Sequence, residues 1–211
     1  MSSEKKEWES MLDDEVLVRR FLEGDEAAFS QLVRQWEKPM YSFVYRFISE
    51  REESLDICQE VFTIVFRKVR ELKEKSRFSA WIYKIALNQC RIHRREQRGK
   101  VMISLDVPPD EATADVRAAD LPDRGMGPEE RLSRQELAEQ VRAALDRLTP
   151  EQRTVIIMKE YQGLKFHEIA EILDCPVSTI KSRMYFGLQA LEKELRRRPL
   201  PRPSGPAGEN P

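Results

Sequence analysis

Long apolar runs are missing from this sequence, which has 211 residues. A helix that crosses a membrane needs about 20 consecutive apolar residues, and no stretch approaches that length. The start of the chain, Met1 to Asp14, is polar and acidic, and it lacks the charged and then apolar order of a secretory leader. We therefore expect a cytoplasmic protein with no membrane insertion.

Cysteine and histidine are scarce as well. The three cysteines, Cys58, Cys90 and Cys175, form no closely spaced pair, and only His93 and His167 are available to join them as metal ligands. Zinc sites need ligands at short, regular spacings, which this chain does not offer. We expect reduced thiols in the folded core, no metal site and no cofactor.

Neither sign of charge dominates, because the sequence has 36 Lys and Arg residues and 37 Asp and Glu residues, which gives a net charge of −1. A protein that coats nucleic acid uniformly would be strongly basic, so any DNA contact must come from local basic patches. Catalytic signals are missing too: there are no paired carboxylates, no nucleophile in a histidine context and no glycine-rich phosphate loop. We expect no enzymatic activity and no catalytic residue.

Apolar residues recur at intervals of three and four with no sustained alternation, which predicts an all-α protein. Residues 99–128 differ, because they are rich in Gly, Pro, Ala and acidic residues and have no aromatic side chain. Such a segment buries too little apolar area to offset the entropy of ordering it, so we expect a flexible acidic linker. It separates two small helical domains, 13–98 and 129–198, and the Pro- and Gly-rich tail 199–211 is expected to be disordered.

The first domain is predicted to contain four helices. The first starts near Val16 and ends before Gly24, and the second starts near Ala28 and continues past Pro39 to Ile48. The remaining two are predicted over Ser54–Leu72 and Phe78–Arg98.

Polar side chains share one face of the third predicted helix: Asp56, Gln59, Glu60 and Thr63. Their spacing of three, one and three places acids and amides in one patch, which suits a basic partner surface. An ordinary solvated helix face explains the same pattern, and it is the favoured interpretation when the pattern is taken alone.

The fourth predicted helix carries a basic stripe. Its polar positions alternate by four, three, four and three, with Arg94 nearby: Lys84, Asn88, Arg91, Arg95 and Arg98. Such a stripe can follow a phosphate backbone, and the Asn88 amide can pair with a base edge. Trp81 lies at a core-periodic position, so it either packs in the core or supports an unstacked base.

The pattern of the second domain predicts a helix-turn-helix that is preceded by one more helix, which we call the entry helix. Thr149 and Gln152 have the spacing of a capping box around Pro150, and Gly163 is placed to end the entry helix. The segment 174–176 separates two further short helices, of which the second is expected to be capped by Ser178 or Thr179. A small residue, Ala170, suits the point where these two helices cross.

In a helix-turn-helix the start of the second helix enters the major groove. Ile180 and Met184 should point inward. The residues expected to contact DNA, which we call the candidate readers, are Ser178, Thr179, Lys181, Ser182, Arg183 and Tyr185. Arg183 suits a guanine or a phosphate, and Lys181 suits a phosphate. The alternative is a solvated helix face that never meets DNA.

The chain resembles bacterial RNA polymerase sigma factors of the extracytoplasmic-function (ECF) group of the sigma-70 family over nearly its whole length. The segment DICQEVFTIVFRKV (56–69) is similar to the core-polymerase-binding segment, and FSAWIYKIALNQCRIHRREQR (78–98) is similar to the minus-ten segment. The C-terminal motif is similar to the minus-thirty-five reader. The resemblance implies a sigma region 2 and region 4 protein that directs promoter-specific initiation and aids promoter melting.

The resemblance also implies partners and roles. The beta-prime coiled coil of core RNA polymerase would be contacted by Asp56, Gln59, Glu60, Phe62 and Thr63. Minus-ten DNA would be contacted by Lys84, Asn88, Arg91, Arg94, Arg95 and Arg98. Asn88 and the loop Lys73 to Arg77 would capture a flipped base. Further implied partners are the beta flap, promoter DNA and an anti-sigma factor.

Some positions depart from the usual family pattern. Phe186 and Leu188 replace common arginines of the recognition helix, Gly187 lies in the middle of that helix, and Ile92 replaces a common aspartate. We expect the promoter preference to differ accordingly. Glycine inside a helix is expected to cost up to about 1 kcal/mol relative to alanine.

A repressor or activator with a helix-turn-helix is the alternative from another class. Its first domain would sense a ligand or form a dimer, and it would need neither the acidic face around Asp56 nor the basic helix around Asn88. Such proteins usually bind a palindrome as dimers, whereas a sigma factor requires polymerase and an asymmetric promoter.

Overall fold

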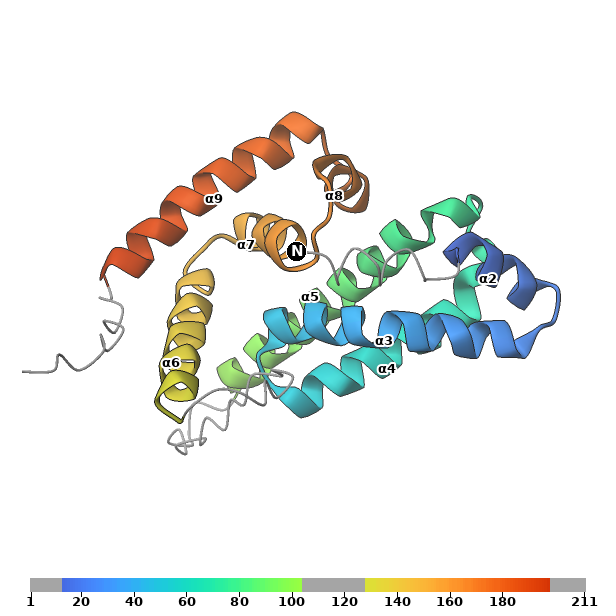
Figure 1. Ribbon diagram of the computed structural model, residues 1–211, viewed down its shortest axis with the longest axis horizontal. Coiled ribbons are helices and arrows are strands. Elements are labelled where there is room, and N and C mark those ends of the chain that lie inside the picture. Colours follow the sequence, from blue (N-terminus) through green and yellow to red (C-terminus); the bar gives the residue numbers. More distant parts are fainter. Residues whose placement is uncertain (1–12, 104–127, 198–211) are drawn as a thin grey trace, which may run out of the picture.

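A computed structural model describes residues 13–103 and 128–197 (Figure 1). Its secondary structure is helical and includes no strand within these two ranges, which confirms the predicted all-α class. Most of the predicted linker and the predicted tail lie outside the described residues. Within the described ranges, no helix is long and apolar enough to span a bilayer.

The N-terminal helices form a bundle around α3, which packs against α2, α4 and α5. Aromatic rings fill its centre, where Trp36 and Phe43 both meet the ring of Tyr83 edge to face. Pro39 lies inside α3 without ending it, as predicted. The elements are α2 (Asp14–Leu22), α3 (Glu26–Ile48), α4 (Arg51–Lys68), η1 (Val69–Glu71), η2 (Lys75–Arg77) and α5 (Phe78–Ile103).

Two helix boundaries in this bundle differ from the prediction. The third helix begins at Arg51 rather than Ser54, because the Glu50 carboxylate accepts hydrogen bonds from the N–H groups of Glu52 and Glu53 and caps the helix. Its last turn is 3₁₀ rather than α-helical. The fourth helix continues to Ile103, so the first residues assigned to the linker are helical.

The C-terminal helices form a second unit in which α9 packs against α6, α7 and α8. The predicted capping box is present, since Thr149 and Gln152 exchange hydrogen bonds around Pro150, and Gly163 adopts the left-handed conformation with φ 65°. The elements are α6 (Pro128–Leu145), α7 (Pro150–Ile156), the π-helical turn η3 (Ile157–Tyr161), α8 (Phe166–Leu173) and α9 (Val177–Arg197).

The start of the recognition helix differs from the prediction. Helix α9 begins at Val177, so Ser178 and Thr179 lie inside its first turn rather than capping it. The carbonyl of Pro176 accepts from the N–H groups of Thr179 and Ile180, and the preceding left-handed Asp174 ends α8. Proline therefore stands immediately before the helix, where a Ser or Thr cap was expected.

The structure explains why glycine occupies position 187, which the sequence pattern did not. A Cβ at this position would lie 3.0 Å from Cδ1 of Ile156 and 3.2 Å from Cβ of Gln152. Both neighbours belong to α7, which packs closely on α9. Glycine at this point lets the two helices approach.

Gly187→Ala is therefore expected to lower the free energy of unfolding by about 1 kcal/mol, because overpacking costs about 1–3 kcal/mol and exceeds the gain in helix propensity. Urea denaturation would measure it. Gln189→Ala, at an exposed position of the same helix, should change stability by less than about 0.5 kcal/mol. Equal or higher stability of Gly187→Ala would contradict this role.

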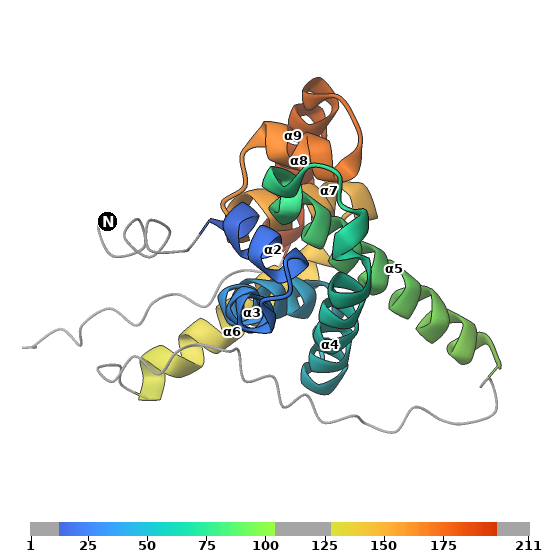
Figure 2. The same ribbon diagram turned by 90° about the vertical axis from the view of Figure 1, so that its right-hand side faces the viewer.

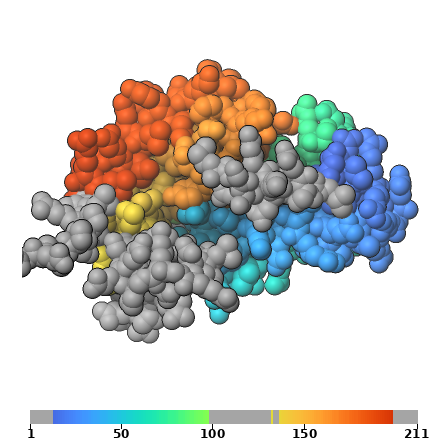
Figure 3. Space-filling model, viewed as in Figure 1, coloured from blue at the N-terminus to red at the C-terminus, as the bar shows by residue number. Residues whose placement is uncertain are grey.

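The two units pack directly against each other, which the sequence patterns did not predict. Helix α8 contacts α5, and η3 contacts α3. Buried hydrophobic residues of both units belong to one continuous cluster. Figures 1 and 2 both show α7 and α8 lying against the N-terminal bundle, and in Figure 3 the C-terminal residues (orange to red) lie above the N-terminal ones (blue to cyan).

Candidate nucleic-acid interface

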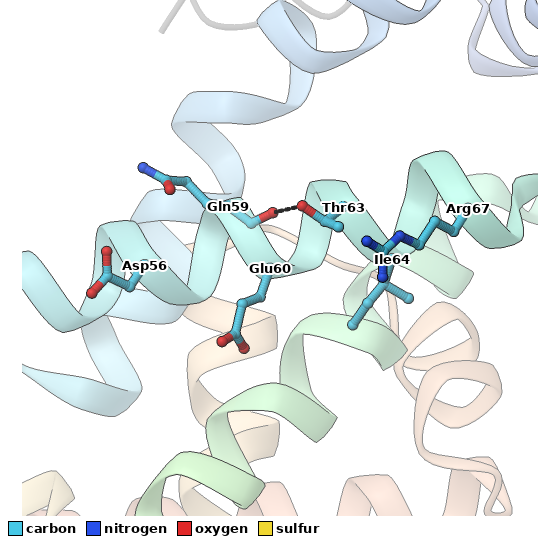
Figure 4. A pocket seen from close by; sticks show the side chains of 6 residues that line it. All are labelled: Asp56, Gln59, Glu60, Thr63, Ile64 and Arg67. Carbon is cyan, nitrogen blue, oxygen red and sulfur yellow. Dashed lines mark hydrogen bonds between the residues drawn. The ribbon is translucent and has the colours of Figure 1, made fainter.

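Helix α4 carries a shallow groove on its exposed side (Figure 4). Thr63 donates a hydrogen bond to the carbonyl of Gln59 at 2.8 Å, which holds the hydroxyl against the helix. The opposite side of α4 is buried and includes Ile57 and Val61, so the bundle fixes which face is exposed. The groove is lined by Asp56, Gln59, Glu60, Thr63, Ile64 and Arg67.

Of the five residues predicted to bind core polymerase, four line this groove and one does not. Phe62 is partly buried and packs against the core, so it does not line the groove. Ile64 and Arg67 were missed, although they follow Glu60 and Thr63 at helical steps of four. We call the six lining residues the α4 groove.

The cysteines behave as buried thiols. Burial raises the pKa of Cys58 and of Cys90 to about 12, so both stay protonated and unreactive near neutral pH. Cys175 is partly buried, and all three are free of disulfides. Among the described residues no cluster of three potential metal ligands occurs.

Helix α5 presents most of the predicted basic stripe to solvent. Lys84, Asn88, Arg91 and Arg95 are exposed. Arg94 instead turns toward the C-terminal unit, where it lies 3.5 Å from the Asp146 carboxylate.

The side chain of Arg98 lies outside the described residues. Trp81 is partly buried against the core, with its ring 6.0 Å from that of Phe78, which favours the packing role over the stacking role.

The loop before α5 is folded into short 3₁₀ turns rather than extended. The ammonium group of Lys75 donates to the carbonyl of Leu72 and so closes the loop. Arg77 forms ion pairs with Glu74 at 2.6 Å and with Glu171 of α8 at 3.2 Å. This loop therefore meets the C-terminal unit directly.

The recognition helix α9 turns the predicted apolar positions inward, since Ile180 and Met184 are buried. Thr179 and Arg183 lie at the margin, half-buried, and the Arg183 guanidinium lies 3.7 Å from the thiol of Cys175. The exposed candidate readers are Ser178, Lys181, Ser182 and Tyr185.

Phe186 is also exposed, and it lies beside the candidate reader Tyr185. Its ring is 56% exposed and lies 5.4 Å from that of Tyr185. The two rings place an apolar patch beside the polar readers.

With this geometry established, comparison with known proteins identifies the family. Residues 32–100 match sigma-70 region 2 and residues 138–191 match sigma-70 region 4. The first match covers α4, the loop and most of α5, and the second covers the helix-turn-helix. The chain belongs to the ECF group of the sigma-70 family.

Curated relatives align with nearly the whole chain. RNA polymerase sigma-H factor of Pseudomonas aeruginosa is 30% identical over 86% of this chain and 93% of its own length. ECF RNA polymerase sigma-E factor of Escherichia coli K12 is 32% identical over 87% of this chain and 95% of its own length. The chain is thus similar to these sigma factors in both regions.

Solved structures share the fold. CnrH in complex with the cytosolic domain of CnrY has a TM-score of 0.65 and 21% identity, over 89% of this chain and 99% of that chain. The sigma factor RpoE in complex with the anti-sigma factor NepR, from Bartonella quintana, has a TM-score of 0.61 and 21% identity, over 81% and 98%. At this identity the likeness concerns the fold alone.

Proposed function

We propose that this protein binds core RNA polymerase and directs transcription initiation at specific promoters without catalysing a reaction itself. The α4 groove binds the coiled coil of the beta-prime subunit, α5 and its preceding loop bind and help to melt minus-ten DNA, and α9 reads the minus-thirty-five element. The observation that carries the proposal is that region 2 and region 4 occur in order on one chain, each with an exposed polar face.

The chemistry of the three faces supports these assignments. The α4 groove contains two carboxylates and one guanidinium, which suits a partner with more basic than acidic groups. Helix α5 offers exposed cations around one amide, so it can hold phosphates while Asn88 meets a base. On α9 the exposed hydroxyl groups and Lys181 lie near the helix start, which is the part that enters a major groove.

We also propose regulation by an anti-sigma factor. Both of the solved structures described above are complexes, one with the cytosolic domain of CnrY and the other with the anti-sigma factor NepR. Because a masking partner must compete with polymerase, the α4 groove and the surface of region 4 are the surfaces it would cover. The cytoplasm, where polymerase works, is the compartment this function requires.

The repressor-like alternative makes a different prediction about DNA protection. We would map DNase I protection on fragments from upstream of this protein's own gene, with and without core polymerase. The proposed function predicts an asymmetric footprint that appears only when both proteins are present. A palindromic footprint produced by this protein alone would instead establish the alternative.

Asn88→Ala is expected to reduce open-complex formation by about 10-fold while changing closed-complex binding by less than about 3-fold, because a flipped base needs a fitted partner only after melting. Permanganate footprinting reports melting, and gel shift on ice reports closed complexes. Gln97→Ala on the same helix, where Gln97 bonds to Glu53 at 2.6 Å, is the control. Equal losses in both assays for Asn88→Ala would argue against base capture.

A further inference from the structure

Two aromatic rings are exposed next to each other on the recognition helix α9. Tyr185 is 59% exposed and Phe186 is 56% exposed, and their ring centres lie 5.4 Å apart with an angle of 72° between the ring planes. Single exposed apolar residues need no explanation, but adjacent ones that border polar residues are typical of a binding surface. The two rings therefore indicate a ligand that offers apolar groups at this point.

Helical geometry places Phe186 on the side of α9 that carries the polar candidate readers. Ser178, Ser182 and Phe186 follow one another at steps of four, which keeps them on neighbouring turns of one side. Tyr185 lies seven residues after Ser178, on the same side. The opposite side is buried and includes Ile180, and Figure 1 shows α9 along the outer edge of the molecule. Phe186 therefore extends the surface that we propose to enter the major groove.

Cations are few on this part of the surface. Between Val177 and Gln189 the cationic residues are Lys181 and Arg183. Arg183 is half-buried at the margin, and its guanidinium lies 3.7 Å from the thiol of Cys175. Because bidentate pairing with guanine is the commonest specific contact in the major groove, a surface without a central guanidinium is poorly suited to guanine. The centre of this surface offers hydroxyl groups and rings instead.

The hydroxyl group of Ser182 is held as an acceptor beside these rings. It donates to the carbonyl of Ser178 at 3.0 Å, which uses its one proton and leaves the oxygen lone pairs for an outside donor. Phe186 lies one turn further along the helix. An adenine·thymine pair presents the amino group of adenine and the C5-methyl group of thymine at its major-groove edge, whereas a guanine·cytosine pair has an amino group but no methyl group. The acceptor and the ring together match the adenine·thymine pair.

We propose that Phe186 is a specificity-determining residue, whose ring contacts the C5-methyl group of a thymine in the duplex bound by α9. Ser182 accepts from the adenine amino group of the same base pair or of its neighbour. A ring packed on a methyl group removes apolar surface of both from water, so the contact favours thymine over a base that lacks the methyl group. This assignment rests on the proposed function, because it requires that α9 enter duplex DNA.

A protein partner is the competing ligand for the two rings, since aromatic residues are enriched in protein interfaces as well. The arrangement of the exposed apolar side chains favours DNA. Leu188 is also exposed, but it lies about 200° around the helix from Phe186 at about 100° per residue. The apolar groups of α9 therefore form no broad patch, and the narrow pair of rings bordered by hydroxyl groups fits the edge of a base pair.

Deoxyuridine tests this contact at the level of one methyl group, because it differs from thymidine only by a hydrogen in place of that group. The duplex is first selected from a random library, once with the full chain alone and once with the full chain and core polymerase. Each thymine of the selected sequence is then replaced by deoxyuridine in turn. Fluorescence anisotropy measures the affinity of the wild type and of the variants for every duplex.

The wild type is expected to bind about fourfold more weakly when the methyl group beside Phe186 is removed, which is the change that burial of about one CH₂ group makes to an equilibrium constant. Phe186→Ala is expected to bind the thymine duplex and the uracil duplex equally at that position. The control is Leu132→Ala, which truncates another exposed apolar side chain, on α6, and should keep the difference. Circular dichroism checks that helix content is kept.

Two results would overturn the thymine contact. One is equal affinity of the wild type for the thymine duplex and every uracil duplex. The other is a methyl effect that persists in Phe186→Ala at every sensitive position, which would assign the contact to another residue and favour a protein partner for the rings.

Failure of the proposed function gives a different result. The chain alone would then select a palindrome, core polymerase would add nothing, and the deoxyuridine comparison would be made on that palindrome. If neither form selects any sequence, α9 reads no duplex and the thymine contact is wrong, whereas run-off transcription still decides the proposed function.

Discussion

Asp56→Arg is expected to lower the affinity for core RNA polymerase about 30-fold, which corresponds to ~2 kcal/mol. Asp56 is exposed at one end of the α4 groove, so the substitution leaves the buried side of α4 unchanged. The new guanidinium would face a surface that we propose to be basic, and attraction would become repulsion. Biolayer interferometry with immobilised core polymerase would measure the change.

The control for this prediction is Glu23→Arg, which makes the same charge change in region 2 but away from the α4 groove. Glu23 is exposed at the end of α2, where a cation suits the helix dipole. The control should bind polymerase within about twofold of the wild type, as expected for a charge outside the contact. Equal affinities for Asp56→Arg and the wild type would remove the α4 groove from the polymerase contact.

Arg153→Met is expected to lower the free energy of unfolding by about 2–4 kcal/mol, because it removes a buried cation from its hydrogen bonds and from its ion pair with the partly exposed carboxylate of Asp146, and hydrogen bonds of charged groups contribute about 1.5–3 kcal/mol each. The substitution also leaves the carbonyls of Arg46 and Phe47 without their donor. Methionine has a similar length, so a large cavity is avoided and the loss reports the polar contacts. Guanidinium denaturation followed by circular dichroism would measure it.

The same experiment also reports whether the two regions unfold together. Because Arg153 links α7 to the end of α3, we expect a single transition in the wild type and two separate transitions in Arg153→Met. Arg147→Met, at an exposed position, is the matched control and should change stability by less than about 0.5 kcal/mol. A loss below about 1 kcal/mol in Arg153→Met would show that the interface does not depend on this residue.

Local features were predicted well because their causes are local. The capping box at Thr149 and Gln152 and the left-handed Gly163 depend on a few neighbouring residues, and the structure confirms them. The start of α4 was missed because Glu50 is not among the residues that most often cap helices, although its carboxylate performs that task.

Long-range features could not be predicted in the same way. Every residue from Arg153 to Met158 is buried, because α7 lies between α9 and the N-terminal bundle. The run of apolar residues Val155–Met158 could have indicated that this segment packs against neighbouring helices on more than one side, since a helix that is apolar all round is buried. Nothing in the spacing indicated that Arg153 would meet Arg46, which lies 107 residues earlier.

Only part of the candidate site could be predicted, because the site also depends on contacts between residues that lie far apart in the sequence. Helical periodicity grouped the exposed residues of α4 and α5, because the polar face of an amphipathic helix follows from spacing alone. It did not separate Arg94 from Arg95, although Arg94 turns toward Asp146 and Arg95 faces solvent. That difference depends on where region 4 docks.

The most direct test of the proposed function is run-off transcription with purified core polymerase, with and without this protein, on genomic fragments that include the region upstream of its own gene. We expect new discrete transcripts that require this protein and are lost with Asp56→Arg. No protein-dependent transcript from any fragment, together with specific duplex binding by the protein alone, would contradict the assignment of these surfaces to transcription initiation.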